Sequence, residues 1–110
     1  MDTACIRVRL KSGSLPRVRE WAAELERRRE EVLTTLKDEG VVVESVFLDR
    51  VAGYDVLVYY VKARDAAAAA RAVRGSQHDV DAYHAAFKRD TWDERTPLKL
   101  LVDFENLPGS

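Results

Sequence analysis

The apolar residues of the chain follow two different periods, and the period changes several times along the sequence. Ile6, Val8 and Leu10 alternate with small or charged residues, which is typical of a strand with one buried face. From residue 15 to about residue 39, apolar residues instead recur at spacings of three, four and seven. This second pattern predicts one long amphipathic helix that ends at Gly40.

Segments 41–50 and 54–62 come next, and both are rich in β-branched and aromatic residues. A short turn with Ala-Gly at 52–53 separates them, which is the pattern of a β-hairpin. If these two residues form the turn, the register places Arg50 opposite Asp55. The sequence thus predicts both the hairpin and, conditionally, its pairing.

The last third of the chain predicts two helices and a strand. Asp65 can cap a helix that ends at Gly75, a further helix covers about 80–92, and a final strand covers 98–105. The order is therefore strand, helix, strand, strand, helix in two parts, and strand. This is the βαββαβ order of an α+β, ferredoxin-like fold with a four-stranded antiparallel sheet.

The predicted hairpin has apolar residues on both of its faces, whereas the helices of this fold cover only one face of the sheet. One hairpin face holds Ser45, Phe47, Val56, Val58 and Tyr60, and the other holds Val46, Leu48, Leu57, Tyr59 and Val61. An uncovered apolar face indicates a partner surface. We expect a homodimer in which two sheets pack face to face as a dimeric α/β barrel. The alternative is a monomeric sheet with imperfect alternation.

Length and charge narrow the class of protein. The chain has 110 residues, and we expect one domain over 1–107 and a tail over 108–110. Lys and Arg number 18 against 19 Asp and Glu, so no basic excess favours a nucleic-acid partner. The single cysteine, Cys5, excludes an intramolecular disulfide. No apolar run approaches the roughly 20 residues of a membrane span and no signal peptide is visible, so no membrane partner and a cytoplasmic location are expected.

Three segments carry a resemblance to a known family: CIRVRLKSGS, VVVESVFLDR and HDVDAYHAAFK. They are similar to an uncharacterised family of short bacterial proteins in the dimeric α+β-barrel superfamily, and the resemblance covers about residues 4–107. It implies the ferredoxin-like fold and the homodimer. It carries over no catalytic residue, because the family has no established general activity. The wider superfamily includes cofactor-independent monooxygenases, isomerases, lactone-forming enzymes, haem-binding enzymes and stress-response domains, so the fold does not decide the function.

The two histidines lie within one short segment. His84 shares the apolar stripe of the predicted third helix with Phe87, beside Tyr83, and His78 lies just before that helix. A helix N-terminus would favour the neutral form of His78. A neutral imidazole can act as base, acid or ligand near pH 7. The alternative is that His84 packs in the core and His78 caps the helix or faces solvent.

Charged residues within the strands are further candidates. Glu44 interrupts an apolar strand, and burial would raise its pKa into the range of a general acid or base; alternatively it points to solvent and protects a sheet edge. Arg7 and Arg9 either hold an anionic oxygen of a ligand or form salt bridges at the rim with Asp103 or Glu105. Aromatic side chains can line a flat apolar pocket or pack in the core or an interface; they are Trp21, Tyr54, Tyr59, Tyr60 and Trp92.

These candidates suggest a small cofactor-independent enzyme that acts on an apolar or aromatic, polyketide-like metabolite by cyclisation, isomerisation or cofactor-free oxygenation. The predicted catalytic residues are His84, Tyr83, Glu44 and His78, and the predicted substrate contacts are Arg7, Arg9, Tyr60, Phe87 and Trp92. Two alternatives stay open: a non-catalytic dimeric ligand-binding or accessory protein, and a haem or metal protein with His84 as a ligand. No cofactor and no metal site are expected.

Overall fold

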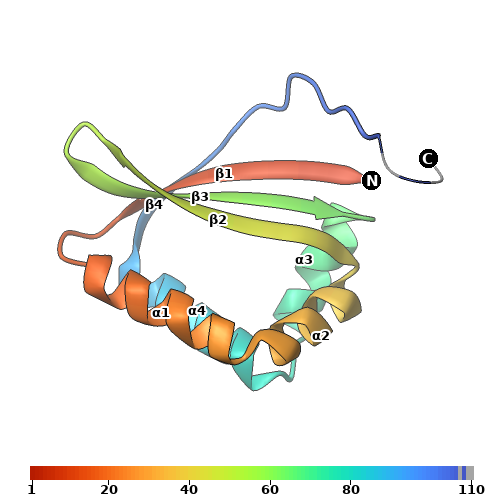
Figure 1. Cartoon of the computed structure of the whole chain (residues 1–110), viewed down its shortest axis with the longest axis horizontal. Helices are drawn as coiled ribbons and strands as arrows, with labels where there is room; N and C mark the ends of the chain where they lie inside the picture. Colours follow the sequence, from red (N-terminus) through yellow and green to blue (C-terminus); the bar gives the residue numbers. More distant parts are fainter. Residues whose placement is uncertain (107, 109–110) are drawn as a thin grey trace.

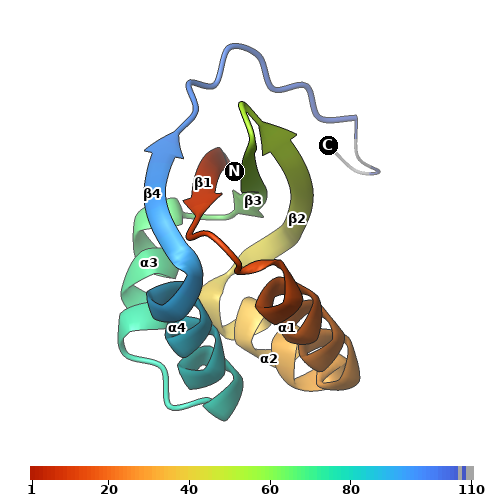
Figure 2. The same ribbon diagram turned by 90° about the vertical axis from the view of Figure 1, so that its left-hand side faces the viewer.

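A computed structural model describes residues 1–106 and 108. Its elements in chain order are β1 (Asp2–Leu10), α1 (Leu15–Arg27), α2 (Arg29–Glu39), β2 (Val41–Val51), β3 (Tyr54–Ala63), α3 (Ala66–Arg74), α4 (Asp79–Thr91) and β4 (Trp92–Pro97). The strands form an antiparallel sheet in the order β2-β3-β1-β4, and the helices lie on one side of it (Figures 1 and 2). This confirms the ferredoxin-like α+β fold. The predicted tail includes residues 109 and 110, which lie outside the described part, as does residue 107.

The β2–β3 hairpin has the predicted register. Arg50 lies opposite Asp55, and their side chains form an ion pair with an N–O distance of 2.9 Å. Ala52 and Gly53 have φ angles of 52° and 84°. Two positive φ angles in succession are those of a type I′ turn, whose twist matches that of the flanking strands. The two-residue turn therefore fixes which side chains of the hairpin face the helices.

The fourth strand lies earlier in the sequence than its apolar pattern suggested. The prediction of a strand over 98–105 is wrong, because β4 covers Trp92–Pro97 and follows α4 directly. β4 pairs only with β1, and most of its side chains are exposed. Charged residues suit such a sheet edge because they discourage pairing with another chain. Because β4 lies at the edge of the sheet, its sequence is polar and lacks the apolar alternation that predicts a strand.

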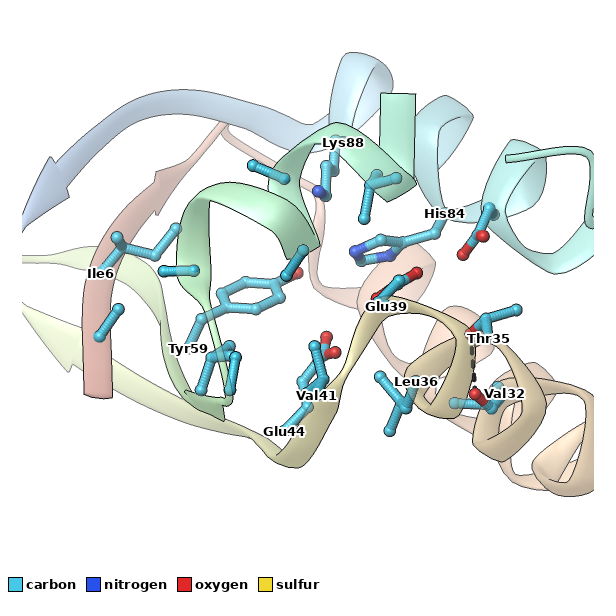
Figure 3. Close-up of a pocket in the computed structure, with 18 of the residues that line it drawn as sticks. Ile6, Val32, Thr35, Leu36, Glu39, Val41, Glu44, Tyr59, His84 and Lys88 are labelled. Atoms are coloured by element: carbon cyan, nitrogen blue, oxygen red, sulfur yellow. Dashed lines mark hydrogen bonds between the residues drawn. The ribbon is translucent and has the colours of Figure 1, made fainter. Parts of the chain in front are cut away.

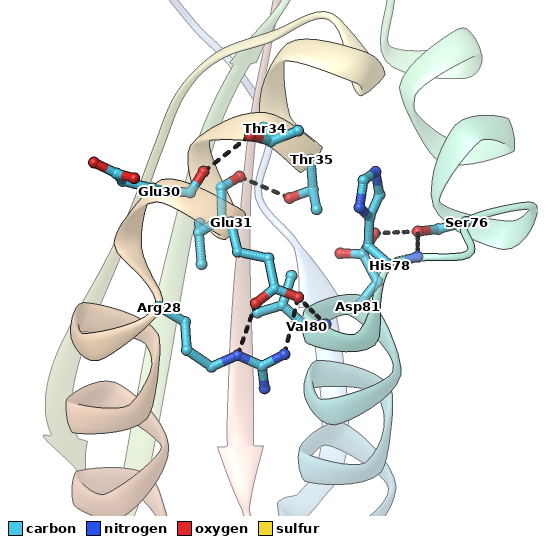
Figure 4. Close-up of polar contacts among 10 residues, drawn as sticks. Arg28, Glu30, Glu31, Thr34, Thr35, Ser76, His78, Val80 and Asp81 are labelled. Carbon is cyan, nitrogen blue, oxygen red and sulfur yellow. Dashed lines mark hydrogen bonds and ion pairs between the residues drawn. The ribbon is translucent and has the colours of Figure 1, made fainter.

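The long helix predicted over 15–39 is interrupted at Arg28, which separates α1 from α2. The Arg28 guanidinium binds Glu31 through two hydrogen bonds of 2.9 Å. Glu31 also accepts a hydrogen bond of 3.1 Å from the backbone N–H of Val80, in the first turn of α4 (Figure 4). The N-cap residue of α4, His78, makes no capping hydrogen bond with its side chain. The carboxylate of Glu31 thus satisfies an N–H that the helix itself leaves unpaired.

The hydrophobic core lies between the sheet and the pair α1 and α4. It consists of Val8, Leu10, Val18, Trp21, Leu57, Tyr59 and Phe87. Phe87 is completely buried and stacks on Trp21, with ring centroids 4.3 Å apart and planes 6° apart.

A helix that spans a membrane has to be both long and apolar. None of the helices within the described residues is long and apolar enough to cross a membrane.

Residues 98–106 form an extended C-terminal arm along the sheet face that is opposite to the helices (Figure 2). Lys62, only 7% exposed, binds Asp103 and Glu105 of the arm at N–O distances of 3.1 and 3.4 Å. The two acidic residues therefore pair with Lys62, and not with Arg7 or Arg9 as the salt-bridge alternative predicted.

Candidate functional site

A cavity of about 320 Å³ lies between the sheet and the helices, beside the packed core. Residues of all four strands and all four helices line it, with α1 contributing Leu25 alone. Its wall on α3 consists largely of Ala66, Ala69 and Ala70. Because an alanine side chain ends at Cβ, this helix covers the sheet without filling the space beneath it. The volume suits a small organic molecule.

Polar residues also line this mostly apolar space, among them Asp2, Thr35, Asp81 and Arg95, and five further polar side chains extend into it (Figure 3). They are Glu39 at the end of α2, Glu44 on β2, Tyr59 on β3, and His84 and Lys88 on α4. Within the described residues, neither carboxylate forms an ion pair shorter than 4.0 Å. The cavity therefore combines an apolar wall with titratable groups that are available to a ligand.

The charged forms of these groups are disfavoured by burial. Burial, together with the negative charges of Asp81 and Glu44, raises the pKa of Glu39 to about 7. Glu44 is an exposed residue at the mouth of the cavity, and the partial burial of its carboxyl group raises its pKa, although Lys88 opposes the rise. Burial lowers the pKa of Lys88, while Glu44 opposes the fall. A carboxyl group with a pKa of about 7 is able to accept and to donate a proton at neutral pH.

His84 has a defined tautomer. Its Nδ1 atom lies 3.1 Å from Nε1 of Trp21, and an indole N–H only donates, so Nδ1 is the acceptor. The ring proton of the neutral imidazole is therefore on Nε2. Burial lowers the pKa of His84 to about 3, with a smaller contribution from Lys88. At neutral pH His84 is thus an uncharged N–H donor at the cavity wall, and it suits the predicted role of proton carrier poorly.

Two predicted catalytic residues lie outside this cavity. The Tyr83 hydroxyl accepts a hydrogen bond of 3.2 Å from Arg17. His78 lies 2.8 Å from Asp38, measured from Nε2 to a carboxylate oxygen, and this contact raises the pKa of His78. The expectation that the helix N-terminus favours neutral His78 is therefore wrong, because the nearby carboxylate has the larger effect.

The predicted substrate contacts are also divided. Trp92 lines the cavity, whereas Phe87 belongs to the fully buried core. Arg7, Arg9 and Tyr60 lie on the opposite sheet face, because their strand neighbours point toward the helices. Arg9 pairs there with Asp93 at 2.9 Å and lies over the ring of Tyr54. Of the predicted residues, the cavity brings together Glu44, His84 and Trp92, and it does not include Tyr83, His78, Arg7, Arg9, Tyr60 or Phe87.

Sequence reasoning did not select Glu39 or Lys88 as site residues. Lys88 follows His84 by four residues, and this helical spacing places both on one face of α4. Glu39 lies in a charged helix end before Gly40 and has no comparable signal. Among residues 1–106 and 108, no three His, Cys, Asp or Glu side chains are grouped as metal ligands.

Comparison with known proteins gives one family and one fold. A family model described as a family of unknown function, DUF6176, matches residues 1–108. A search of curated proteins found no match. Among solved structures, the crystal structure of an L-rhamnose mutarotase from Formosa agariphila is similar, with a TM-score of 0.63 and 16% sequence identity over 96% of this chain and 100% of that chain. At this identity the likeness shows a shared fold.

Proposed function

The chain belongs to the family of unknown function DUF6176, and from the geometry of its cavity we propose that it is a small cofactor-independent enzyme that transfers protons on an apolar metabolite. The observation that carries this proposal is the carboxyl group of Glu39, which has a pKa of about 7. It lines an apolar cavity together with a second carboxyl group, that of Glu44. General acid–base catalysis is most effective when the pKa of the catalytic group is near the working pH.

The chain's own residues can supply each part of an isomerisation. Glu39 takes a proton from the substrate and returns it at another position, with Glu44 as the second carboxyl group. His84 donates a hydrogen bond through Nε2, and Lys88 adds positive charge near the carboxyl groups. Isomerisation is favoured over the predicted oxygenation because a proton that is removed and returned needs no oxidant.

The lining favours a ligand with few polar groups. A polyhydroxylated sugar would leave several hydroxyl groups against alkyl side chains, and each unpaired buried polar group weakens binding. We therefore do not expect this chain to share the L-rhamnose substrate named for its structural neighbour. A small cyclic or aromatic compound with one or two oxygens matches the wall better.

Proton exchange in D₂O tests the proposal. The protein is incubated with small cyclic ketones, lactones and phenols, and with L-rhamnose, and ¹H NMR follows the loss of C–H signals and the equilibration of anomers. We expect faster exchange or isomerisation of at least one apolar compound and no acceleration for L-rhamnose. Saturable binding without turnover of any compound would instead support the non-catalytic ligand-binding protein, and turnover of L-rhamnose alone would contradict the apolar substrate.

The second part of the proposal is a homodimer formed through the sheet face that the helices leave uncovered. Phe47 on β2 is 60% exposed, and Leu101 and Phe104 of the C-terminal arm are 83% and 90% exposed. Apolar residues in such numbers on one side of the molecule favour burial against a second copy.

Sedimentation equilibrium tests the dimer. The expected mass is about 25 kDa, which is twice the 12.5 kDa of one chain. Phe47→Glu is expected to weaken association at least about tenfold, because a buried charge without a partner is costly. Leu33→Glu, a matched change at an exposed apolar residue of α2, should leave the mass unchanged. A single 12.5 kDa species over the whole concentration range would contradict the dimer.

A further inference from the structure

Two buried polar atoms at the wall of the cavity lack a hydrogen-bond partner among the described residues. They are the Tyr59 hydroxyl and Nε1 of Trp92. Tyr59 is only 5% exposed, and its ring meets that of Trp92 edge to face, with centroids 5.3 Å apart. Buried polar groups are nearly always paired, so an unpaired group at a cavity wall calls for a partner from outside the chain.

Both groups can donate a hydrogen bond. The indole N–H of Trp92 is a donor only. Burial raises the pKa of Tyr59, so its hydroxyl keeps its proton at neutral pH. The Trp92 N–H lies toward the Tyr59 oxygen and opposes this rise as a hydrogen-bond donor does, although the contact falls outside strict hydrogen-bond geometry. The hydroxyl proton of Tyr59 thus lacks an acceptor.

A third donor lies beside them. The ring centroids of Tyr59 and His84 are 6.2 Å apart, and the Nε2–H of His84 has no partner among the described residues. Lys88 adds positive charge, with Nζ 5.0 Å from the centre of the Trp92 ring. In Figure 3 the Tyr59, His84 and Lys88 side chains extend into the same space, with the carboxyl groups of Glu39 and Glu44 beside it. This side of the cavity suits an electron-rich oxygen.

We infer that the cavity binds the carbonyl oxygen of a small, largely apolar ketone or related enolisable compound, with the Tyr59 hydroxyl and the Nε2–H of His84 as hydrogen-bond donors and Trp92 beside them. The inference deepens the proposed function and rests on it for the chemical step. A carboxylic acid derivative without α-hydrogens would bind to the same donors but would not react.

The step that follows is balanced without any further reactant. The carboxylate of Glu39 takes a proton from the carbon next to the carbonyl group. The C–H electron pair becomes the new C=C bond, and the C=O π pair moves to the oxygen, where the donors stabilise the negative charge. The Glu39 carboxyl group then returns the proton to the other face of the same carbon, or to the γ-carbon where a second C=C bond is conjugated with the enolate, and the carbonyl group re-forms.

Two probes of the same shape test the oxygen site. Acetophenone and α-methylstyrene differ in a C=O group against a C=CH₂ group. One added hydrogen bond corresponds to a preference of about tenfold, so we expect acetophenone to bind about tenfold more tightly to the wild-type protein in calorimetric titrations. Tyr59→Phe should reduce this preference to less than about threefold. Tyr60→Phe, the adjacent residue on the opposite sheet face, should retain it.

A spectroscopic measurement on the wild-type protein avoids dependence on the folding of variants. The C=O stretch of ¹³C-labelled acetophenone should shift to lower wavenumber on binding than in an apolar solvent, because hydrogen bonds weaken the C=O bond. Equal affinity for the two probes, an unshifted C=O stretch, or a preference that Tyr59→Phe retains would overturn the oxygen site. Carbonyl preference without proton exchange would refute the proposed catalysis alone, and exchange without carbonyl preference would refute the oxygen site alone.

Discussion

Replacement of Glu39 by Gln is expected to lower kcat/KM for the proton-transfer reaction by about 10²–10⁴-fold, which is the usual contribution of a general acid or base. Glutamine has nearly the same shape and can accept hydrogen bonds, but it cannot carry the proton. Initial rates of exchange in D₂O measure the loss. Glu30→Gln, an exposed change on the same helix, should leave the rate unchanged.

The pH dependence separates this role from a structural one. If Glu39 acts as the base, wild-type kcat/KM rises as pH increases through about 7, and Glu39→Gln removes that rise. The folded-state pKa lies above the usual value of 4.5, so the folded protein binds the proton more tightly than the unfolded chain, and stability falls as pH rises from about 4.5 to about 7. Glu39→Gln abolishes this loss.

At pH 8 the Glu39→Gln variant should therefore be more stable than the wild type, by on the order of 1 kcal/mol, since water screens the exposed part of the side chain. Urea unfolding at pH 5 and pH 8 measures the difference. A rate loss that is accompanied by lower stability at pH 8 would indicate damage to the fold, and an unchanged rate would exclude Glu39 as the proton carrier.

Replacement of Phe87 by Ala is expected to have the largest effect on stability. Phe87 is completely buried and stacks on Trp21, so the substitution removes apolar burial and leaves a cavity in the core. We expect the free energy of unfolding to fall by about 3–5 kcal/mol. In a domain of this length that corresponds to a drop in Tm of roughly 15 °C or more.

Leu33→Ala is the control, because Leu33 is 51% exposed and its loss should cost about 1 kcal/mol or less. Calorimetry of both variants gives the comparison. If Phe87→Ala lost no more stability than Leu33→Ala, the stacked pair would not anchor the core. If Phe87→Ala stayed folded but lost only ligand affinity, the substrate contact predicted from the sequence would replace the core role.

The fold could be predicted where one local pattern decides the structure. Ala52 and Gly53 fit a tight turn, and that turn sets the whole register of β2 against β3. The position of β4 could not be predicted in the same way. A strand at the sheet edge needs no apolar alternation, and the apolar residues of 98–105 lie in an arm that belongs to no strand.

The site residues, too, could be predicted only where a local sequence pattern reveals them. Glu44 and His84 were found because a titratable residue in an apolar pattern is conspicuous. Glu39 was missed because its burial comes from α3, α4 and β2, which are distant from it in the sequence or approach it only after the turn at Gly40. Arg7 and Arg9 were predicted as substrate contacts because charged residues in a strand are conspicuous. They do not line the cavity, because they lie on the opposite face of the sheet.

The alanines of α3 have a consequence for how ligand size is determined. Ala66, Ala69 and Ala70 leave the space that the ligand would fill, and they lie on a different element from the carboxyl groups of Glu39 and Glu44. Exchange of one alanine for leucine would add three carbon atoms to this wall without altering a proton carrier. Under the proposed function, selectivity for size and the chemistry of the reaction are therefore encoded in separate parts of the chain, and we expect a single substitution in α3 to change the first without changing the second.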